Sequence, residues 1–287
     1  ANLTLLELYQ KVPGRLPATI PGQGDHDRLL QRLDDVLVQA GKDLEQALAT
    51  DRFVLRAQPI VQSAVDGTGA DSRHYELLLS LTNKDGSLGS PEEFIQSAER
   101  YGFMSLVDRW VVREAFQWIS QLMDAQKVVP SLAINLSGHS VTDDSFLDYL
   151  LEQISEFGVG TSKLCFEITE SVAVSNMQRA QSFMHSLQRL GCHFSLDDFG
   201  SGLSSFTYLK NLPVDYLKIG GQFISNVADD SVDESMVKAI SEVGHAMGID
   251  TIAERVETKQ VLEKLGSLGI EFAQGYYIAR PTSIRSF

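Results

Sequence analysis

The sequence predicts an α/β protein that folds as a (β/α)8 barrel of the TIM-like type, with an antiparallel first strand and a helical N-terminal extension. Two observations predict the barrel. Eight apolar runs of strand length follow residue 51, at 53–61, 73–81, 132–136, 163–168, 192–197, 214–219, 250–254 and 271–275. Segments with apolar residues at helical spacing separate most of these runs, at 91–101, 105–125, 143–157, 177–190, 232–247 and 259–268. Such alternation within 287 residues is what this barrel requires.

The direction of the first strand follows from the segment after it. The first two runs are joined through Asp66-Gly-Thr-Gly69, which reads as a hairpin connection, so we expect the first strand to run antiparallel to the second. An open, doubly wound sheet is the alternative, but no glycine-rich dinucleotide turn follows the first run.

The first fifty residues have a different pattern. A short apolar helix is expected at 5–9, a linker rich in proline and glycine at 12–25, and a longer amphipathic helix at 26–48. We therefore divide the chain into a linker with helices at 1–50 and a barrel domain at 51–287.

Composition excludes several classes of function. A net charge of −14 argues against a surface that binds duplex nucleic acid and against a polybasic membrane anchor. A small anionic ligand stays compatible with this charge, because divalent cations reverse the local field. No apolar run reaches the roughly 18 residues of a membrane span, and no signal peptide opens the sequence. Cys165 and Cys192 lie in apolar runs, which favours reduced core thiols in a cytoplasmic domain.

Polar side chains stand at the ends of seven consecutive predicted strands. They are Glu76, Asn135, Glu167 with Glu170, Asp197 with Asp198, Lys218, Glu254 with Glu257, and Gln274. The carboxyl ends of barrel strands meet at one face, where chemistry collects. Carboxylate and amide oxygens are the ligands that Mg²⁺, Mn²⁺ and Ca²⁺ prefer. Each residue alone is compatible with a solvent-facing strand end or a helix cap, but together they predict a metal site. His74, His139 and His193 have no ligand spacing and are expected in the core or on the surface.

Taken together, these residues resemble the EAL-domain family of cyclic di-GMP phosphodiesterases from about Phe53 to Pro281. Glu76-Leu77-Leu78 stands at the family's Glu-Ala-Leu, and Gln58-Pro59-Ile60-Val61 stands at its opening strand. Further matches in the family's order are Ala98-Glu99, Asp108-Arg109-Trp110, Asn135, Glu167 with Glu170, Asp197-Asp198-Phe199-Gly200, Lys218, Ala253-Glu254, Glu257 and Gln274-Gly275-Tyr276.

The resemblance implies hydrolysis of cyclic di-GMP to the linear dinucleotide pGpG at a two-metal site with Mg²⁺ or Mn²⁺, and inhibition by Ca²⁺. By position, Glu76, Asn135, Glu167 and Asp197 would hold the first cation. Asp197, Asp198 and Glu254 would serve the second cation and the attacking water, with Glu254 or Lys218 assisting proton removal. The implied substrate-binding or loop-bracing residues are Gln58, Leu79, Ser80, Glu170, Arg255, Glu257 and Gln274.

The resemblance also implies partners and a location. A homodimer through the barrel and an upstream sensory or diguanylate-cyclase-like domain are common in the family. The expected location is cytoplasmic, alone or as part of a larger membrane-associated protein, with no duplex nucleic acid as partner.

Three positions depart from the family pattern. Ser80 replaces an arginine that contacts the substrate phosphate, Gly220 replaces the aspartate of Lys-Ile-Asp, and Arg255 replaces the glycine after Glu254. Loss of a charged phosphate contact weakens binding by roughly 1.5–3 kcal/mol. Arg255 either crowds the site or supplies the missing cation.

The sequence therefore leaves three functions open. The complete set of metal ligands favours an enzyme, whereas the three departures favour a weak or inactive domain that acts as a cyclic di-GMP receptor. A signalling interaction domain without a nucleotide is the third.

Overall fold

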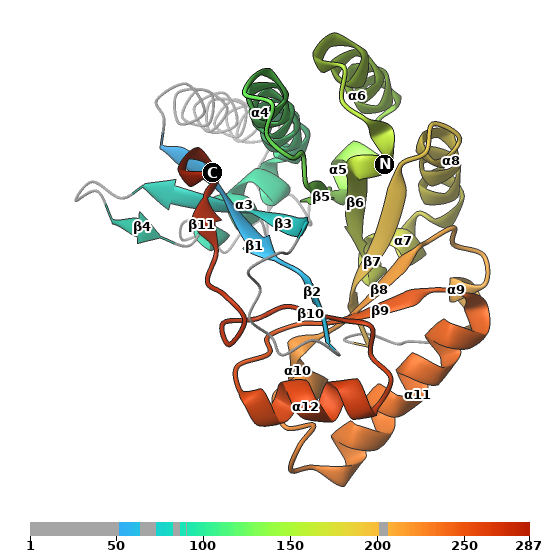
Figure 1. Cartoon of the computed structure of the whole chain (residues 1–287). Helices are drawn as coiled ribbons and strands as arrows, with labels where there is room; N and C mark the ends of the chain where they lie inside the picture. Colours follow the sequence, from blue (N-terminus) through green and yellow to red (C-terminus); the bar gives the residue numbers. More distant parts are fainter. Residues whose placement is uncertain (1–51, 64–72, 83–86, 90, 201–205) are drawn as a thin grey trace, which may run out of the picture. The chain divides into compact units, whose positions relative to one another are not determined.

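A single sheet carries the fold, with its strands in the order β11-β1-β3-β5-β6-β7-β8-β9-β10-β2 (Figure 1). The computed structural model describes residues 52–63, 73–82, 87–89, 91–200 and 206–287, which belong to one compact unit. The barrel strands are β1 (Phe53–Pro59), β2 (Val61–Gln62), β3 (His74–Thr82), β5 (Ser131–Asn135), β6 (Leu164–Thr169), β7 (His193–Phe199), β8 (Tyr216–Ile219), β9 (Asp250–Ala253) and β10 (Phe272–Ala273). Because only Ile60 separates β1 from β2, one chain segment pairs with β3 on one side and with β10 on the other, which closes the barrel. The predicted barrel is confirmed.

The first strand runs as predicted. β1 pairs antiparallel with β3 from Phe53 opposite Leu81 to Pro59 opposite Tyr75, while neighbours from β3 to β10 pair in parallel. Two short strands were not predicted: β4 (Leu88–Gly89) pairs with β3, and β11 (Thr282–Ser283) pairs with β1. The hairpin segment at 66–69 and the helices expected at 1–50 lie outside the described residues.

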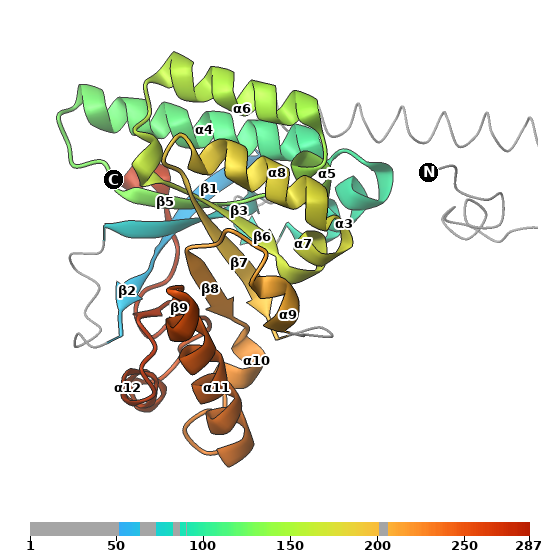
Figure 2. The ribbon, with the colours of Figure 1, turned by 90° about the vertical axis from the view of Figure 1, so that its right-hand side faces the viewer.

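All six predicted helices are present, within two residues at each end. They are α3 (Glu92–Tyr101), α4 (Met104–Asp124), α6 (Asp144–Phe157), α8 (Met177–Gln188), α11 (Ser231–Met247) and α12 (Lys259–Ser267). Shorter elements that periodicity does not reveal are α5 (Gly138–Val141), α7 (Glu170–Ser175), α9 (Phe206–Leu209), α10 (Gly221–Ile224), η1 (Thr161–Lys163) and η2 (Ile284–Ser286). Figure 2 shows α4, α6 and α8 together on one side of the strands, with α11 and α12 at the opposite end. No helix in the described ranges is long and apolar enough to cross a membrane.

Local sequence signals set the helix ends. The side chain of Asp230 accepts hydrogen bonds from the backbone of Val232 and Asp233 and so caps the start of α11. Gly248 ends the same helix in the left-handed conformation, at φ 72°. The acidic run before α11 is therefore a helix start rather than a site, as its sequence indicates.

An apolar layer fills the barrel below the strand ends. Ile60, Ala133, Cys165 and Ile252 are buried together, and Tyr216 and Phe272 pack against them. Side chains two positions apart on a strand share a face. The residues two positions further along these strands are therefore directed into the barrel, and they are polar: Asn135, Glu167, Lys218, Glu254 and Gln274. Cys165 and Cys192 are free and buried, in agreement with the predicted core thiols.

Candidate active site

The ammonium group of Lys218 lies at the centre of the carboxyl-end face, and none of its side chain is exposed. Four carboxylates surround it. Its Nζ atom lies 2.8 Å from Glu167 Oε2, 2.9 Å from Glu254 Oε1, 3.3 Å from Asp197 Oδ1 and 3.4 Å from Glu76 Oε2. Acids from β3, β6, β7 and the end of β9 thus meet one cation on β8, so that a single ammonium group faces four carboxyl groups.

This imbalance shifts the proton affinities of the cluster. Burial raises the pKa of Glu167 well above its ordinary value and that of Glu254 to about 7, against the opposing effect of Lys218. Burial also acts to raise the pKa of Glu76, but Lys218 and hydrogen bonds from Asn135 and Gln274 outweigh it and hold that pKa low. For Lys218 itself, burial acts to lower the pKa, and the surrounding carboxylates raise it well above its usual range. Lys218 therefore stays protonated. Because the carboxyl groups outnumber this one cation, the cluster favours the binding of further positive charge.

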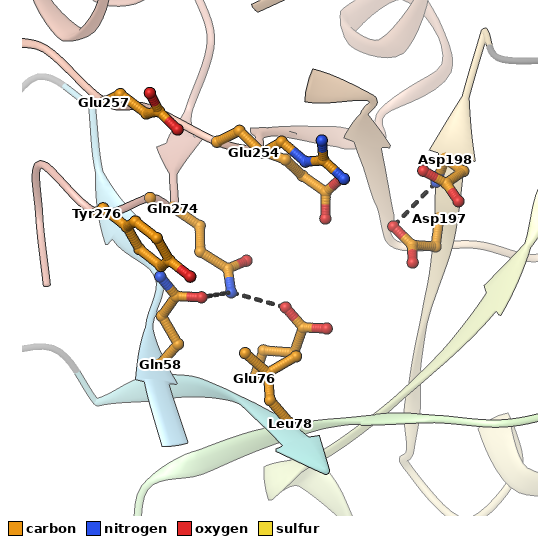
Figure 3. A pocket seen from close by; sticks show the side chains of 11 residues that line it. Gln58, Glu76, Leu78, Asp197, Asp198, Glu254, Glu257, Gln274 and Tyr276 are labelled. Atoms are coloured by element: carbon orange, nitrogen blue, oxygen red, sulfur yellow. Dashed lines mark hydrogen bonds between the residues drawn. The ribbon is translucent and has the colours of Figure 1, made fainter. Parts of the chain in front are cut away.

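Two side-chain amides hold Glu76 in place. Asn135 Nδ2 donates to Glu76 Oε1 over 2.8 Å, and Gln274 Nε2 donates to Glu76 Oε2 over 2.6 Å. The same Gln274 nitrogen lies 3.1 Å from Gln58 Oε1, as Figure 3 shows. These bonds link β1, β3, β5 and the end of β10, and they leave Glu76 as an oriented, ionised carboxylate.

An irregularity in β7 brings two consecutive acids to the site. Between Leu196 and Phe199, three steps along β7 match two along β8, which is the mark of a β-bulge. Asp198 has φ 53°, and its backbone N–H donates to Asp197 Oδ1 over 2.9 Å. In a regular strand, neighbouring side chains would face opposite ways. Because of the bulge, both aspartates line the same pocket.

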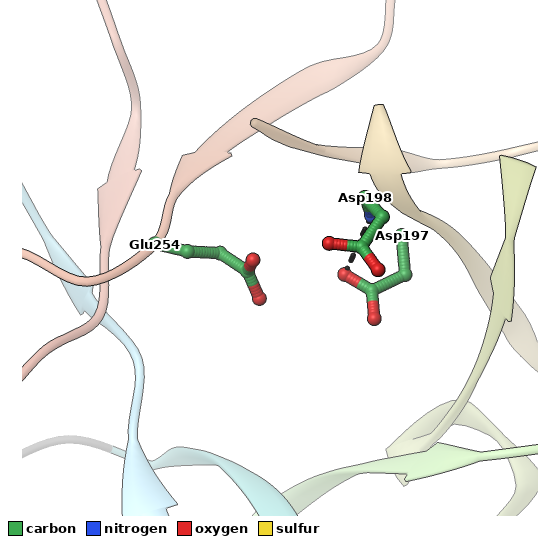
Figure 4. Close-up of side chains that lie close together, drawn as sticks. All are labelled: Asp197, Asp198 and Glu254. Atoms are coloured by element: carbon green, nitrogen blue, oxygen red, sulfur yellow. Dashed lines mark hydrogen bonds between the residues drawn. The ribbon is translucent and has the colours of Figure 1, made fainter. Parts of the chain in front are cut away.

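Asp197, Asp198 and Glu254 form a cluster of metal-ligating type (Figure 4). Each offers one oxygen, and these oxygens lie within 4.8 Å of one another. Buried Glu167 Oε1 and Gln274 Oε1 have no hydrogen-bond partner. A buried oxygen without a partner and a donor set of carboxylates both suit a hard divalent cation. The residues present fit a metal centre of this kind.

Glu170 lies at the edge of the site rather than in it. It begins α7 directly after β6, and its Oε2 accepts a hydrogen bond from the backbone of Gly200 over 3.0 Å. Gly200 follows β7 with φ 91°, a conformation that favours glycine. Glu170 thus fixes the chain where it leaves the two aspartates.

A pocket of about 490 Å³ opens over the acids. Eight of the predicted site residues line it: Gln58, Glu76, Asp197, Asp198, Glu254, Arg255, Glu257 and Gln274. Asn135 and Lys218 do not line it but contact residues that do, and Glu167 contacts Lys218. Leu79, Ser80 and Glu170 are also outside the lining.

Leu78 lines the pocket together with Gly275 and Tyr276, and none of the three was predicted as a site residue. A signal for Leu78 is present in the sequence. It lies two positions after Glu76 on β3, so the two side chains share a face and that of Leu79 does not.

The three unusual positions lie in different surroundings. Ser80 is buried on β3 opposite Val54. Gly220 directly precedes α10, and Arg255 follows Glu254 with φ 53°. A left-handed conformation costs a residue with a side chain about 1–2 kcal/mol, so the backbone at Arg255 is strained.

Comparisons with known proteins agree on the class of domain. The sequence model of the EAL domain matches residues 41–281. The chain is 39% identical over 249 residues to the cyclic di-GMP phosphodiesterase PdeB of Shewanella oneidensis, and the match covers 85% of this chain and 28% of that protein. It is 36% identical over 238 residues to the cyclic di-GMP phosphodiesterase PdeF of Escherichia coli, with 83% and 31% covered. The chain thus spans about a third of the length of these curated relatives.

Solved structures give the same result for the fold. The phosphodiesterase PaMucR in complex with c-di-GMP superposes with a TM-score of 0.79 at 32% identity, over 86% of this chain and 99% of that one. The FimX EAL domain of Pseudomonas aeruginosa bound to c-di-GMP superposes with a TM-score of 0.75 at 28% identity, over 86% and 96%.

Proposed function

Because this chain belongs to the EAL domain family, we propose that its residues 51–287 form a metal-dependent phosphodiesterase that hydrolyses cyclic di-GMP to pGpG. One observation carries the proposal: strand-end carboxylates converge on buried Lys218, and three of the acids form a cluster of metal-ligating type beside the pocket. The relatives PdeB and PdeF are named as phosphodiesterases for this substrate.

Two sets of residues would hold the cations. Glu76, Asn135, Glu167 and Asp197 are proposed for the first, and Asp197, Asp198 and Glu254 for the second. Bound divalent cations would lower the pKa of water and neutralise developing charge on the phosphate oxygens. Mg²⁺ or Mn²⁺ is proposed as the active cation and Ca²⁺ as an inhibitor, because Ca²⁺ prefers longer bonds and more ligands.

Glu254 is the proposed proton acceptor. Its carboxyl group lies 2.9 Å from Lys218 Nζ and lines the pocket, where it can face an attacking water. Lys218 keeps its proton because the surrounding carboxylates raise its pKa, so it acts as a fixed charge that orients Glu254. Water loses a proton to Glu254, its oxygen joins phosphorus, and one phosphorus–ribose oxygen bond breaks. The freed ribose oxygen takes a proton from solvent and becomes a hydroxyl group.

The remaining residues would bind and orient the dinucleotide. Gln274 would hold the side chains of Glu76 and Gln58 in place through its hydrogen bonds. Glu170 would hold the chain at Gly200. Leu79, Ser80 and Glu257 remain proposed substrate residues. A cytoplasmic location, a homodimer through the barrel and an upstream sensory or diguanylate-cyclase-like domain are part of the same proposal. One relative is a bifunctional diguanylate cyclase/phosphodiesterase, of which this chain covers 34%.

The test is incubation of the protein with cyclic di-GMP and Mn²⁺, followed by chromatography of the nucleotides. We expect pGpG to appear, a chelator to suppress it, and Glu254→Ala to lower kcat by about 100-fold or more. The matched control is Glu263→Ala, which removes an exposed acid on α12 and should leave kcat unchanged. Binding without product would instead make the domain a cyclic di-GMP receptor and would overturn the enzymatic proposal.

A further inference from the structure

The pocket over the acids has an unusual balance of charge for a phosphate ligand. Of its eleven lining residues, five are carboxylates and two are amides, whereas Arg255 is the one cation among the described residues that line it. A cyclic dinucleotide carries two phosphodiester groups, each with a negative charge. Cations held by the acids would face the phosphate under attack, so the other phosphate needs a separate donor.

The position of the Arg255 side chain depends on its packing against Gly221. A β-carbon built on Gly221 would lie 2.3 Å from Arg255 Cδ and 2.8 Å from Arg255 Cγ. The stem of the arginine therefore lies directly on the first residue of α10, where only glycine leaves enough room. A β-carbon on Gly220 would meet only the carbonyl oxygen of Phe199, at an ordinary distance of 3.8 Å. Gly221 and Arg255 thus form a matched pair.

The guanidinium group is available to a ligand. Arg255 is exposed, and in the described part of the chain its side chain makes no hydrogen bond or ion pair within 4 Å, while its charge acts on Asp198 in the same pocket. Five N–H donors in a planar fork suit the oxygens of a phosphate. The pocket still measures about 490 Å³ with the arginine in its wall, within the range of ligand pockets. That volume argues against the reading in which Arg255 merely crowds the site.

We propose that Arg255 is the phosphate-binding cation of this pocket, held over Gly221 so that its guanidinium donates to a phosphodiester oxygen of the cyclic dinucleotide. This inference rests on the proposed function.

The first experiment compares KM, kcat and thermal stability of Arg255→Gly and Arg255→Lys with the wild type. Arg255→Gly should raise KM roughly 10-fold or more with little change in kcat, because a charge-assisted contact to bound substrate is lost. Arg255→Lys keeps the charge without the planar fork, so its KM should lie between those of the wild type and Arg255→Gly. Glycine adopts φ 53° without strain, so Arg255→Gly should melt at the same or a higher temperature. A purely structural role for the arginine would lower the melting temperature instead.

The glycines provide a matched pair of variants. Gly221→Ala places a methyl group where the stem of Arg255 lies and should raise KM, while Gly220→Ala should leave it unchanged. In the Arg255→Gly background, Gly221→Ala should have no further effect on KM. A KM for Arg255→Gly within twofold of the wild type would overturn the inference, as would an equal effect of Gly221→Ala with and without the arginine.

Failure of the inference can be told apart from failure of the proposed function. If the wild type hydrolyses cyclic di-GMP and Arg255→Gly has the same KM, the inference alone is wrong. If the wild type binds without hydrolysis, the same comparison is made on the Kd from calorimetry, and an unchanged Kd overturns the inference. If the wild type neither binds nor hydrolyses cyclic di-GMP, both are wrong.

Discussion

Replacement of Lys218 by methionine should destabilise the metal-free protein strongly. The variant keeps a long side chain of similar length but removes the one ammonium group that contacts Glu76, Glu167, Asp197 and Glu254. Removal of one partner from a buried ionic cluster leaves uncompensated charge and costs about 3–5 kcal/mol. For a domain of this size, a loss of 1 kcal/mol in unfolding free energy lowers the melting temperature by about 2–4 °C. We therefore expect the melting temperature to fall by about 6–20 °C.

The loss should depend on pH. Without Lys218, the pKa values of Glu167 and Glu254 in the folded state rise further above the unfolded value of about 4.3, and Glu76 loses the charge that holds its pKa low. A carboxyl group with a raised folded pKa binds more protons when folded, so its destabilising effect grows as pH rises through that window. The raised pKa of Lys218 means that the wild type keeps its ammonium charge from pH 5 to 8. The difference between the two proteins should therefore be small near pH 5 and largest near pH 8.

Scanning calorimetry in the presence of a chelator measures this effect, and Mn²⁺ should restore part of the stability because cations replace the missing charge. Lys238→Met is the matched control, since Lys238 is exposed and lies 3.9 Å from Glu242 on α11, and it should change stability by less than about 0.5 kcal/mol. Equal losses in the two variants, or a loss for Lys218→Met that does not change with pH, would refute the account of the cluster.

Two further predictions concern metal affinity and the packing beside the site. Because Glu254 has a pKa of about 7, a proton competes with the cation, and Mn²⁺ should bind about 10-fold more tightly at pH 8 than at pH 6 with release of protons. Calorimetry in two buffers of different ionisation enthalpy measures both. Asp108→Ala should lower stability by about 1–3 kcal/mol, measured by thermal unfolding, because buried Asp108 accepts hydrogen bonds from Ser137 N over 2.9 Å and Ser140 Oγ over 2.7 Å.

Each of these two predictions can be contradicted by a specific result. An Mn²⁺ affinity that is the same at pH 6 and pH 8 would show that no proton is displaced from the cluster. For the second, Asp148→Ala removes an exposed acid on α6 and serves as control. If it lowers stability as much as Asp108→Ala, the hydrogen bonds to the start of α5 do not carry the effect.

Much of the fold could be predicted because periodicity is a local property of the chain. The strands around Glu167 and Lys218 are short apolar runs bounded by loops, and helices such as α11 have apolar residues at helical spacing with a capping aspartate. The short helices α5, α7, α9 and α10 were missed because four to six residues are too few to show a period.

By itself, the sequence determined the barrel, its antiparallel first strand and the acids, amides and lysine at its strand ends, because each depends on the order of residues along one strand. Only the tertiary structure decided how these residues meet. It placed Lys218 among four carboxylates from other strand ends, and it turned Asp197 and Asp198 to one pocket through a bulge that depends on pairing with β8. It also packed the side chain of Arg255 against Gly221, although the two residues lie far apart along the chain. Such contacts arise from barrel closure, which brings distant segments within a few ångströms and which no local pattern encodes.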